Sequence, residues 1–195
     1  MLAVQGAFIE HEIMLNNMGI ETIELRNKKD LESNFDGLIL PGGESTVQGK
    51  LLKELGMFDG LKEQISSGMP VLGTCAGLIL LASSISNDDK THFATLPVKV
   101  RRNAYGRQLG SFYVEEEFKG LGHVPMKFIR APYIEEVSED VEVLSKVDGK
   151  IVAVRYKNQM GLSFHPELCE DNRIHKLLVD MVQSGSICSY NRLFA

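Results

Sequence analysis

Apolar and polar residues follow one another in blocks along the first half of the chain, and these blocks predict alternating strands and helices. Short apolar runs of strand length occur at residues 2–5, 20–25, 36–40 and 71–74. Apolar residues three or four positions apart predict helices between them, in residues 8–18, 47–55 and 58–65. This alternation over short connections favours a mainly parallel sheet flanked by helices. Ligands bind such sheets beyond the carboxyl ends of the strands.

The pattern changes after about residue 90. Six further strands are predicted there, at residues 95–100, 108–116, 127–129, 141–147, 150–156 and 159–164. Asp148-Gly149 is a strong hairpin signal between two of them, and apolar spacing in residues 174–182 predicts a final helix. The predicted fold is therefore α/β, with a mainly parallel central sheet and an antiparallel strand insert in the C-terminal half. Residues 1–195 are expected to form one domain.

Composition narrows the possible functions. The net charge of −5 disfavours a nucleic-acid partner, and no apolar run reaches the ~20 residues that a membrane span needs. The first residues do not have the pattern of a signal peptide. The three cysteines are irregularly spaced and give no disulfide framework. These features lead us to expect a cytoplasmic protein without a membrane association.

Cys75 stands between two apolar runs, at the point where the fourth predicted strand gives way to a helix. Its neighbours Gly73, Thr74, Ala76 and Gly77 are small, as a sharp turn between strand and helix requires. A thiol at a helix N-terminus lies in a positive field that favours the thiolate, the nucleophilic form. On these residues alone, a nucleophile and a buried structural cysteine are equally good interpretations.

His165 and Glu167 follow the last predicted strand, separated by Pro166. In an extended segment residues two apart point to the same side, so the carboxylate can lie beside the imidazole. This arrangement fixes the histidine tautomer and prepares a base for a thiol. The alternative for this short pattern, a surface turn, loses weight when Cys75 is considered with it.

Gly42-Gly43 follows the third predicted strand, at the same edge of the sheet. A double glycine lets backbone N–H groups approach a reacting carbon and hold the negative charge of an acyl-transfer intermediate. The N–H of Ala76, directly after the cysteine, is the natural second donor. Without the other two patterns, Gly42-Gly43 is a plain tight turn.

These residues belong to six motifs that together resemble a known family. The motifs are Val4-Gln5-Gly6-Ala7-Phe8 with Glu10-His11, Leu40-Pro41-Gly42-Gly43-Glu44-Ser45-Thr46, Gly73-Thr74-Cys75-Ala76-Gly77, Arg102-Asn103 with Gly106-Arg107-Gln108, Phe128-Ile129-Arg130-Ala131-Pro132 and Phe164-His165-Pro166-Glu167. The chain resembles the class I, triad-type glutamine amidotransferases, which have a flavodoxin-like sheet. More narrowly, it resembles the glutaminase subunits of two-component pyridoxal 5'-phosphate synthases.

The resemblance implies a role for each matching residue. Cys75 would attack the side-chain amide of L-glutamine, form a glutamyl thioester and release ammonia. His165 would move the proton and Glu167 would orient His165, while Gly43 and Ala76 would form the oxyanion hole. The glutamine pocket would be lined by Gly43, Glu44, Ser45, Arg102, Ile129 and Arg130. An arginine suits this pocket because its planar fork pairs with a free α-carboxylate through two hydrogen bonds.

The same resemblance implies a protein partner and no metal or cofactor. Family members pass ammonia to a synthase (lyase) subunit, in a large complex with glutaminase subunits around a dodecameric core, and are weakly active until docked. Family members usually carry several more residues before the first strand, so the resemblance extends to the triad chemistry more directly than to docking and activation.

Two other functions remain possible at this stage. One is a catalytically silent regulatory subunit of the same fold, and the other is a related cysteine-elbow intracellular hydrolase, such as a peptidase. Among the remaining histidines, His11 is expected to pack or to contact a partner. His92, His123 and His175 have no matching neighbours in the sequence and are expected to be solvated. Cys169 and Cys188 are expected to be bystanders.

Overall fold

The computed structural model describes residues 1–86, 88–102 and 110–192, with residues 185–192 described by their backbone alone. Its helices are α1 (Phe8–Asn17), α2 (Ser45–Glu54), α3 (Phe58–Ser66), α4 (Ala76–Leu81) and α5 (Arg173–Arg192), with 3-10 turns η1 (Lys28–Glu32) and η2 (Pro166–Leu168). Its strands are β1 (Leu38–Leu40), β2 (Val71–Thr74), β3 (Ala82–Ile85), β4 (Leu96–Arg101), β5 (Ser111–Phe118), β6 (Gly122–Ile129), β7 (Tyr133–Val137), β8 (Glu142–Val147), β9 (Lys150–Tyr156) and β10 (Gln159–Leu162).

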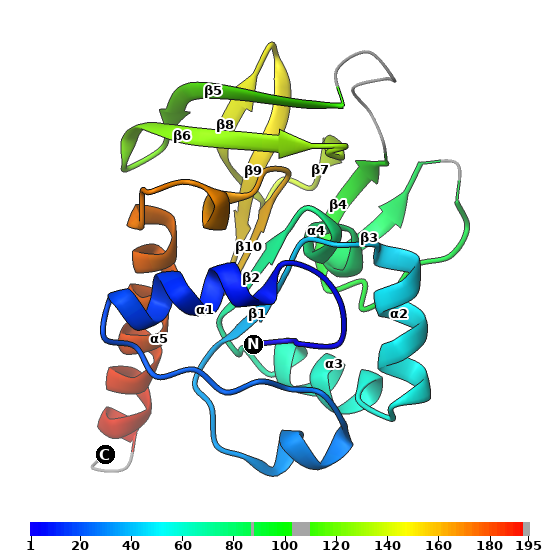
Figure 1. The fold of residues 1–195 in the computed structure, drawn as a ribbon, viewed down its shortest axis with the longest axis vertical. Coiled ribbons are helices and arrows are strands. Elements are labelled where there is room, and N and C mark those ends of the chain that lie inside the picture. The colour runs from blue at the N-terminus through cyan, green and yellow to red at the C-terminus, as the bar shows by residue number, and fades with distance from the viewer. Residues whose placement is uncertain (87, 103–109, 193–195) are drawn as a thin grey trace.

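Eight strands form one mixed sheet in the order β1-β2-β10-β9-β7-β4-β3, with β8 paired to β9. The pairs β1–β2, β2–β10 and β3–β4 are parallel, and the remaining pairs of this sheet are antiparallel. Strands β5 and β6 form a separate hairpin, which crosses the top of the molecule in Figure 1. The α/β class and the antiparallel insert predicted from the sequence are therefore confirmed.

Helices cover both faces of the sheet and close two apolar cores. Leu38 and Leu40 of β1 belong to the core shared with α2, α3 and α4. Ile39, one residue along the same strand, belongs to the core shared with α1, α5 and the β5–β6 hairpin. Successive side chains of a strand point to opposite faces, so a short strand that is apolar throughout must be covered on both sides.

Three neighbouring parallel strands bring the predicted motifs to one edge. Gly42-Gly43 follows β1, Cys75 follows β2 and His165 follows β10, and these strands lie side by side in the order β1-β2-β10. Close packing keeps this edge compact: a Cβ added to Gly77 of α4 would lie 2.0 Å from the backbone oxygen of Leu40. Gly77 therefore lets α4 pack closely on the sheet.

Several elements differ from the sequence prediction. The strands expected at residues 2–5 and 20–25 are reduced to one parallel bridge, Leu2 with Leu25, since they run together for too short a distance to form a ladder. Strands β3 and β7 are not among the strands predicted from the sequence. The hairpin at Asp148-Gly149 is present between β8 and β9, and both residues have positive φ, as a type I′ turn requires. Residues 103–109, which include Asn103 and Gly106-Arg107-Gln108 of one motif and the start of the strand predicted at 108–116, lie outside the described residues.

Candidate active site

Cys75 occupies a strained turn between β2 and α4. Its φ is +48° and its ψ is −96°, a conformation that L residues rarely adopt. Its backbone N–H donates to the Leu162 carbonyl at 2.8 Å, which ties the turn to β10. The side chain is 7% exposed, and Sγ lies 4.0 Å from the Ile129 carbonyl oxygen. A strained backbone that aims one small reactive side chain at a cavity is typical of a nucleophile.

His165 and Glu167 stand beside this thiol. His165 Nδ1 lies 2.7 Å from Glu167 Oε1, and the backbone N–H of His165 donates to the Lys127 carbonyl at 2.8 Å. Both residues are 6% exposed. The imidazole is therefore held from two sides, by the carboxylate and by β6, with its other nitrogen left for Cys75.

The electrostatics of His165 favour a proton on the imidazole. Burial opposes its ionisation, but hydrogen bonds with Cys75 and Glu167 and the charge of Glu167 outweigh burial and raise the pKa of His165 to about 10. Since this value lies well above neutral pH, the histidine can hold the proton that a nucleophilic thiol gives up and deliver it to a leaving group.

A cavity of about 480 Å³ opens in front of Cys75 and His165. It is lined by every residue that the family resemblance assigns to the glutamine pocket: Gly43, Glu44, Ser45, Arg102, Ile129 and Arg130. Ala76 does not line the cavity; it is buried directly behind Cys75 as the first residue of α4. Arg130 has a φ of +43°, a second strained residue on the cavity wall.

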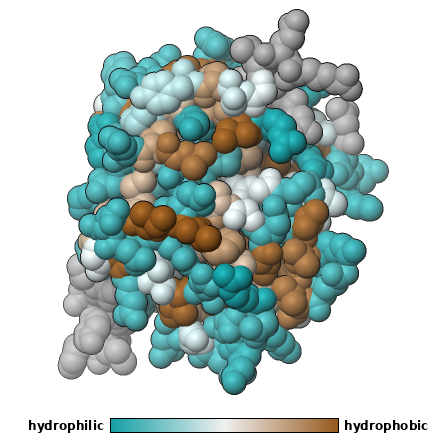
Figure 2. Space-filling model, in the orientation of Figure 1, coloured by the Kyte–Doolittle hydropathy of each residue, from teal (hydrophilic) through white to brown (hydrophobic). Residues whose placement is uncertain are grey.

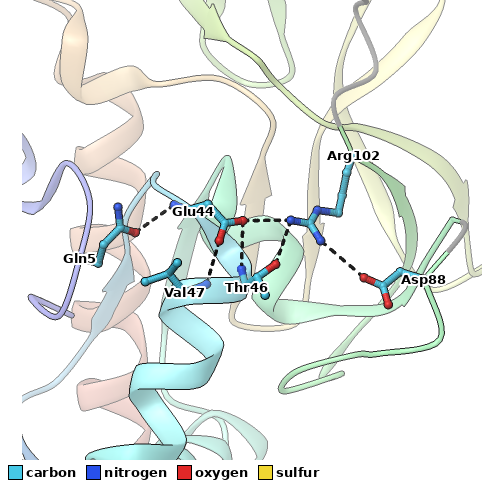
Figure 3. A network of polar contacts seen from close by, with 6 residues as sticks. All are labelled: Gln5, Glu44, Thr46, Val47, Asp88 and Arg102. Atoms are coloured by element: carbon cyan, nitrogen blue, oxygen red, sulfur yellow. Dashed lines mark hydrogen bonds and ion pairs between the residues drawn. The ribbon is translucent and has the colours of Figure 1, made fainter.

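Arg102 lines this cavity and is held by acidic and polar side chains, as Figure 3 shows. Its Nη2 lies 3.0 Å from Glu44 Oε1 and 3.1 Å from Thr46 Oγ1, and its Nη1 lies 3.5 Å from Asp88 Oδ2. Burial opposes ionisation of Glu44, but hydrogen bonds from the backbone of Val47 and Thr46, together with Arg102, keep its pKa below the ordinary value. A substrate carboxylate would have to share the guanidinium with these protein groups.

Gln5 lines the cavity as well, although the sequence analysis assigns no individual role to this residue. Its side-chain oxygen accepts a hydrogen bond from the backbone N–H of Glu44 at 2.9 Å, as Figure 3 shows. The turn has no room for side chains, because a Cβ on Gly43 would lie 2.5 Å from Gln5 Oε1. The Gln5-Gly6 motif was the signal that could have identified this contact.

His11 lies beside Glu167 and contacts His175, and this corrects the sequence interpretation of His175. Both are fully buried, whereas His175 was expected to be solvated. Residues of α1 and α5 meet here, 164 positions apart in the chain, so no local pattern could reveal the pair. His92 is also wrongly predicted, because it is half-buried near Gly49, while His123 is exposed as expected.

The described residues contain no group of three or more His, Cys, Asp or Glu placed to hold a metal ion. Cys75 and Cys169 are free thiols, and Cys188 lies outside the described side chains. In the part of the chain that the structure describes, none of the helices has the length and apolar character needed to cross a membrane.

Comparison with solved structures identifies the class of this fold and site. A crystal structure described as a glutamine amidotransferase is 42% identical, with a TM-score of 0.88 over 93% of this chain and 97% of its own. A glutamine amidotransferase from Thermotoga maritima, 18% identical, shares the fold with a TM-score of 0.61 over 97% of this chain and 84% of its own. The fold and the cysteine site therefore define a glutamine amidotransferase domain.

Sequence comparison narrows this class to one family. The chain belongs to the SNO glutamine amidotransferase family, whose model matches residues 1–184. The pyridoxal 5'-phosphate synthase subunit PdxT of Desulfitobacterium hafniense strain DCB-2 is 67% identical over 94% of this chain and 92% of its own length. The corresponding subunit of Haemophilus influenzae strain PittEE is 55% identical over 92% of this chain and 95% of its own length. The family resemblance predicted from the motifs is confirmed.

Proposed function

We propose that this chain is the glutaminase subunit of a pyridoxal 5'-phosphate synthase, which hydrolyses L-glutamine to L-glutamate and ammonia for vitamin B6 biosynthesis. One observation carries this proposal. Cys75 and His165 line a single cavity and Glu167 Oε1 lies 2.7 Å from His165 Nδ1, in a chain 67% identical to a synthase subunit over 184 residues.

In the proposed reaction the Cys75 sulfur attacks the side-chain amide carbon of glutamine, and His165 receives the thiol proton. The carbonyl oxygen becomes an oxyanion, which backbone N–H groups of Gly43 and Ala76 would stabilise. His165 then gives the proton to the amide nitrogen, the C–N bond breaks and ammonia leaves a glutamyl thioester. Water, deprotonated by His165, hydrolyses the thioester to glutamate and restores the thiol.

Polar groups around the cavity support the choice of an amino-acid substrate. Arg102 and Arg130 provide guanidinium groups for the α-carboxylate, and Glu44 provides a carboxylate for the α-ammonium group. Ser45 is 2% exposed and its hydroxyl has no hydrogen-bond partner among the described residues. Because a buried hydroxyl without a partner is costly, a bound polar ligand would relieve it.

We propose further that the chain works in the cytoplasm, docked on a synthase subunit in a complex with a dodecameric core. An apolar surface next to the cavity supports docking. Ile9 and Ile13 of α1 are each 54% exposed, while Glu10 between them lines the cavity. Apolar side chains gather over α1 in Figure 2. A partner seated there would contact the helix that begins directly after Gln5, Gly6 and Ala7 of the cavity wall.

The test is ammonia release from glutamine by the chain alone and after mixing with its synthase subunit. We expect the mixture to release ammonia and Cys75→Ala to abolish this release while still binding the synthase. No ammonia from the wild-type mixture would refute the glutaminase and favour a silent regulatory subunit. Peptide cleavage without glutaminase activity would favour the cysteine-elbow hydrolase.

A further inference from the structure

Behind the triad, Glu167 contacts a second pair of histidines. We propose that His11 is a positioning residue of the active site, whose Nε2 edge lies against the Glu167 carboxylate and limits its rotation, and which is itself held by His175. This inference rests on the proposed glutaminase reaction, in which Glu167 orients His165. It assigns a function to two residues that the triad chemistry does not use.

The contacts form one continuous chain from the thiol to α5. Glu167 uses Oε1 for His165, and its Oε2 lies 3.3 Å from His11 Nε2. His11 Nε2 is also 3.3 Å from the Thr74 hydroxyl, and His11 Nδ1 is 2.8 Å from His175 Nε2. Thr74 is the residue before Cys75, so His11 touches the triad at both its carboxylate and its nucleophile turn.

The chemistry of these atoms fixes which nitrogens carry hydrogen. Carboxylate oxygens are acceptors, so a hydrogen on His11 Nε2 suits both neighbours of this atom, Glu167 Oε2 and the Thr74 hydroxyl. A neutral His11 then has a bare Nδ1, which accepts from His175 Nε2–H. His175 is left with a bare Nδ1, and this atom has no hydrogen-bond partner among the described residues. An acceptor without a donor costs less here than a buried N–H without an acceptor.

Burial keeps both histidines neutral, as this pattern requires. Burial, reinforced by His175, by His165 and by the N-terminal amine, puts the pKa of His11 well below its ordinary value. Burial also lowers the pKa of His175 to about 4. With both rings neutral, His175 can orient His11 and His11 can orient Glu167. No positive charge then lies beside Glu167 to compete with His165 for the carboxylate.

Packing alone does not account for the position of His11. Glu167 Oε2 is fully buried and has no hydrogen-bond partner among the described residues, while His11 Nε2 lies 3.3 Å from it. Rotation of this carboxylate would break its 2.7 Å contact with His165. A donor on the far side of the carboxylate opposes that rotation, so His11 acts on catalysis through Glu167.

A matched pair of variants separates this role from packing. His11→Gln keeps a donor near the Nε2 position, whereas His11→Asn keeps a polar group near Nδ1 and removes the donor to Glu167. With the synthase subunit present, we expect His11→Asn to lower kcat about tenfold with KM within about twofold, and His11→Gln to stay within about threefold of wild type. Thermal unfolding of both variants controls for stability.

The second readout needs no glutamine, so it remains informative if the proposed function fails. Iodoacetamide alkylates Cys75, and peptide mapping gives the alkylation rate at each pH. The pH dependence of this rate depends on how the Cys75 thiol and the His165 imidazole share a proton. We expect His11→Asn, but not His11→Gln, to move the alkaline limb of this profile toward lower pH, because a loosened Glu167 stabilises protonated His165 less well. Two equally impaired, stably folded variants, or two variants like wild type in both readouts, would overturn the proposal.

Nitrogen-15 NMR of the wild-type histidines tests the proton pattern when a variant does not fold. We expect His11 and His175 both to be neutral at pH 7 with hydrogen on Nε2. Hydrogen on Nδ1 of His11, or a charged His11, would leave no donor toward Glu167 and would overturn the proposal. The absence of ammonia from the wild-type mixture, by contrast, would count against the glutaminase function and not against this pattern.

Discussion

Gly42→Ala tests whether catalysis depends on the exact placement of the His165 ring. A Cβ at position 42 would lie 2.3 Å from His165 Cε1 and 2.8 Å from its Nδ1. Ordinary carbon contacts begin near 3.4 Å, so the ring has to move by about 1 Å. Gly42 has no positive φ that would strain an alanine, and the contact with His165 is therefore the main perturbation.

The magnitude follows from the contacts that the ring would lose. His165 is fixed by a 2.7 Å contact with Glu167 and cannot shift by about 1 Å without stretching this contact or leaving Cys75. Misplacement of a catalytic group by about 1 Å costs roughly 100-fold in rate. Overpacking of a buried site costs about 1–3 kcal/mol of stability, which the fold should survive. We expect kcat to fall about 100-fold, with a small loss in melting temperature.

The assay is steady-state ammonia release with the synthase subunit present, at saturating glutamine. Gly60→Ala in α3 is the matched control, since it makes the same substitution far from the cavity and its nearest neighbour is the flexible end of Leu31. We expect this control to keep wild-type kcat. A Gly42→Ala enzyme that is folded and within about threefold of wild type would refute the reasoning, because His165 would then tolerate displacement.

Three further predictions concern the triad, the helix contact and acid stability. Glu167→Gln removes the charge that helps to raise the pKa of His165, so kcat should fall on the order of 10²- to 10⁴-fold, and the alkaline limb of the kcat/KM profile should move to lower pH. Gly77→Ala places a Cβ 2.0 Å from the Leu40 carbonyl oxygen and should lower the free energy of unfolding in urea by about 3 kcal/mol; an unchanged midpoint would contradict this contact. The pKa of His175 is lowered to about 4 in the folded chain. As the pH falls, His175 therefore binds a proton in the unfolded chain before it does so in the folded chain, and this favours unfolding. Stability should therefore fall between pH 6.5 and 4 by on the order of 3 kcal/mol, and less steeply in His175→Gln.

The sequence predicted the cavity-facing part of the site because each motif is local. Cys75, the Gly42-Gly43 turn and His165 each follow directly on an apolar run, and consecutive residues carry both the strand and the chemistry. The rule that parallel strands present their carboxyl ends at one edge then brings the three motifs together. The assumption needed was that β1, β2 and β10 are neighbours, and the sheet order bears this out.

The sequence did not predict the strands and contacts that depend on distant pairing. Residues 2–5 and 20–25 have strand patterns but form a single bridge beside β1, since strand length is decided by the neighbouring segments. Strand β7 is half-buried between β4 and β9 and lacks a clear apolar alternation of its own. Local propensity says little about whether such a segment forms a strand, because packing against the neighbouring strands decides this.

The contacts of His11 indicate that residues other than Cys75, His165 and Glu167 also affect the geometry of the site. In the sequence His11 is a single polar residue on an amphipathic helix, and packing is the reasonable interpretation. In the fold the same residue contacts Glu167, Thr74 and His175, so α1 and α5 both bear on the orientation of His165. Glu10, the preceding residue of α1, lines the cavity. A displacement of α1 would therefore reach the cavity and Glu167 together, and this is the physical route by which the proposed partner would act on the rate of glutamine hydrolysis.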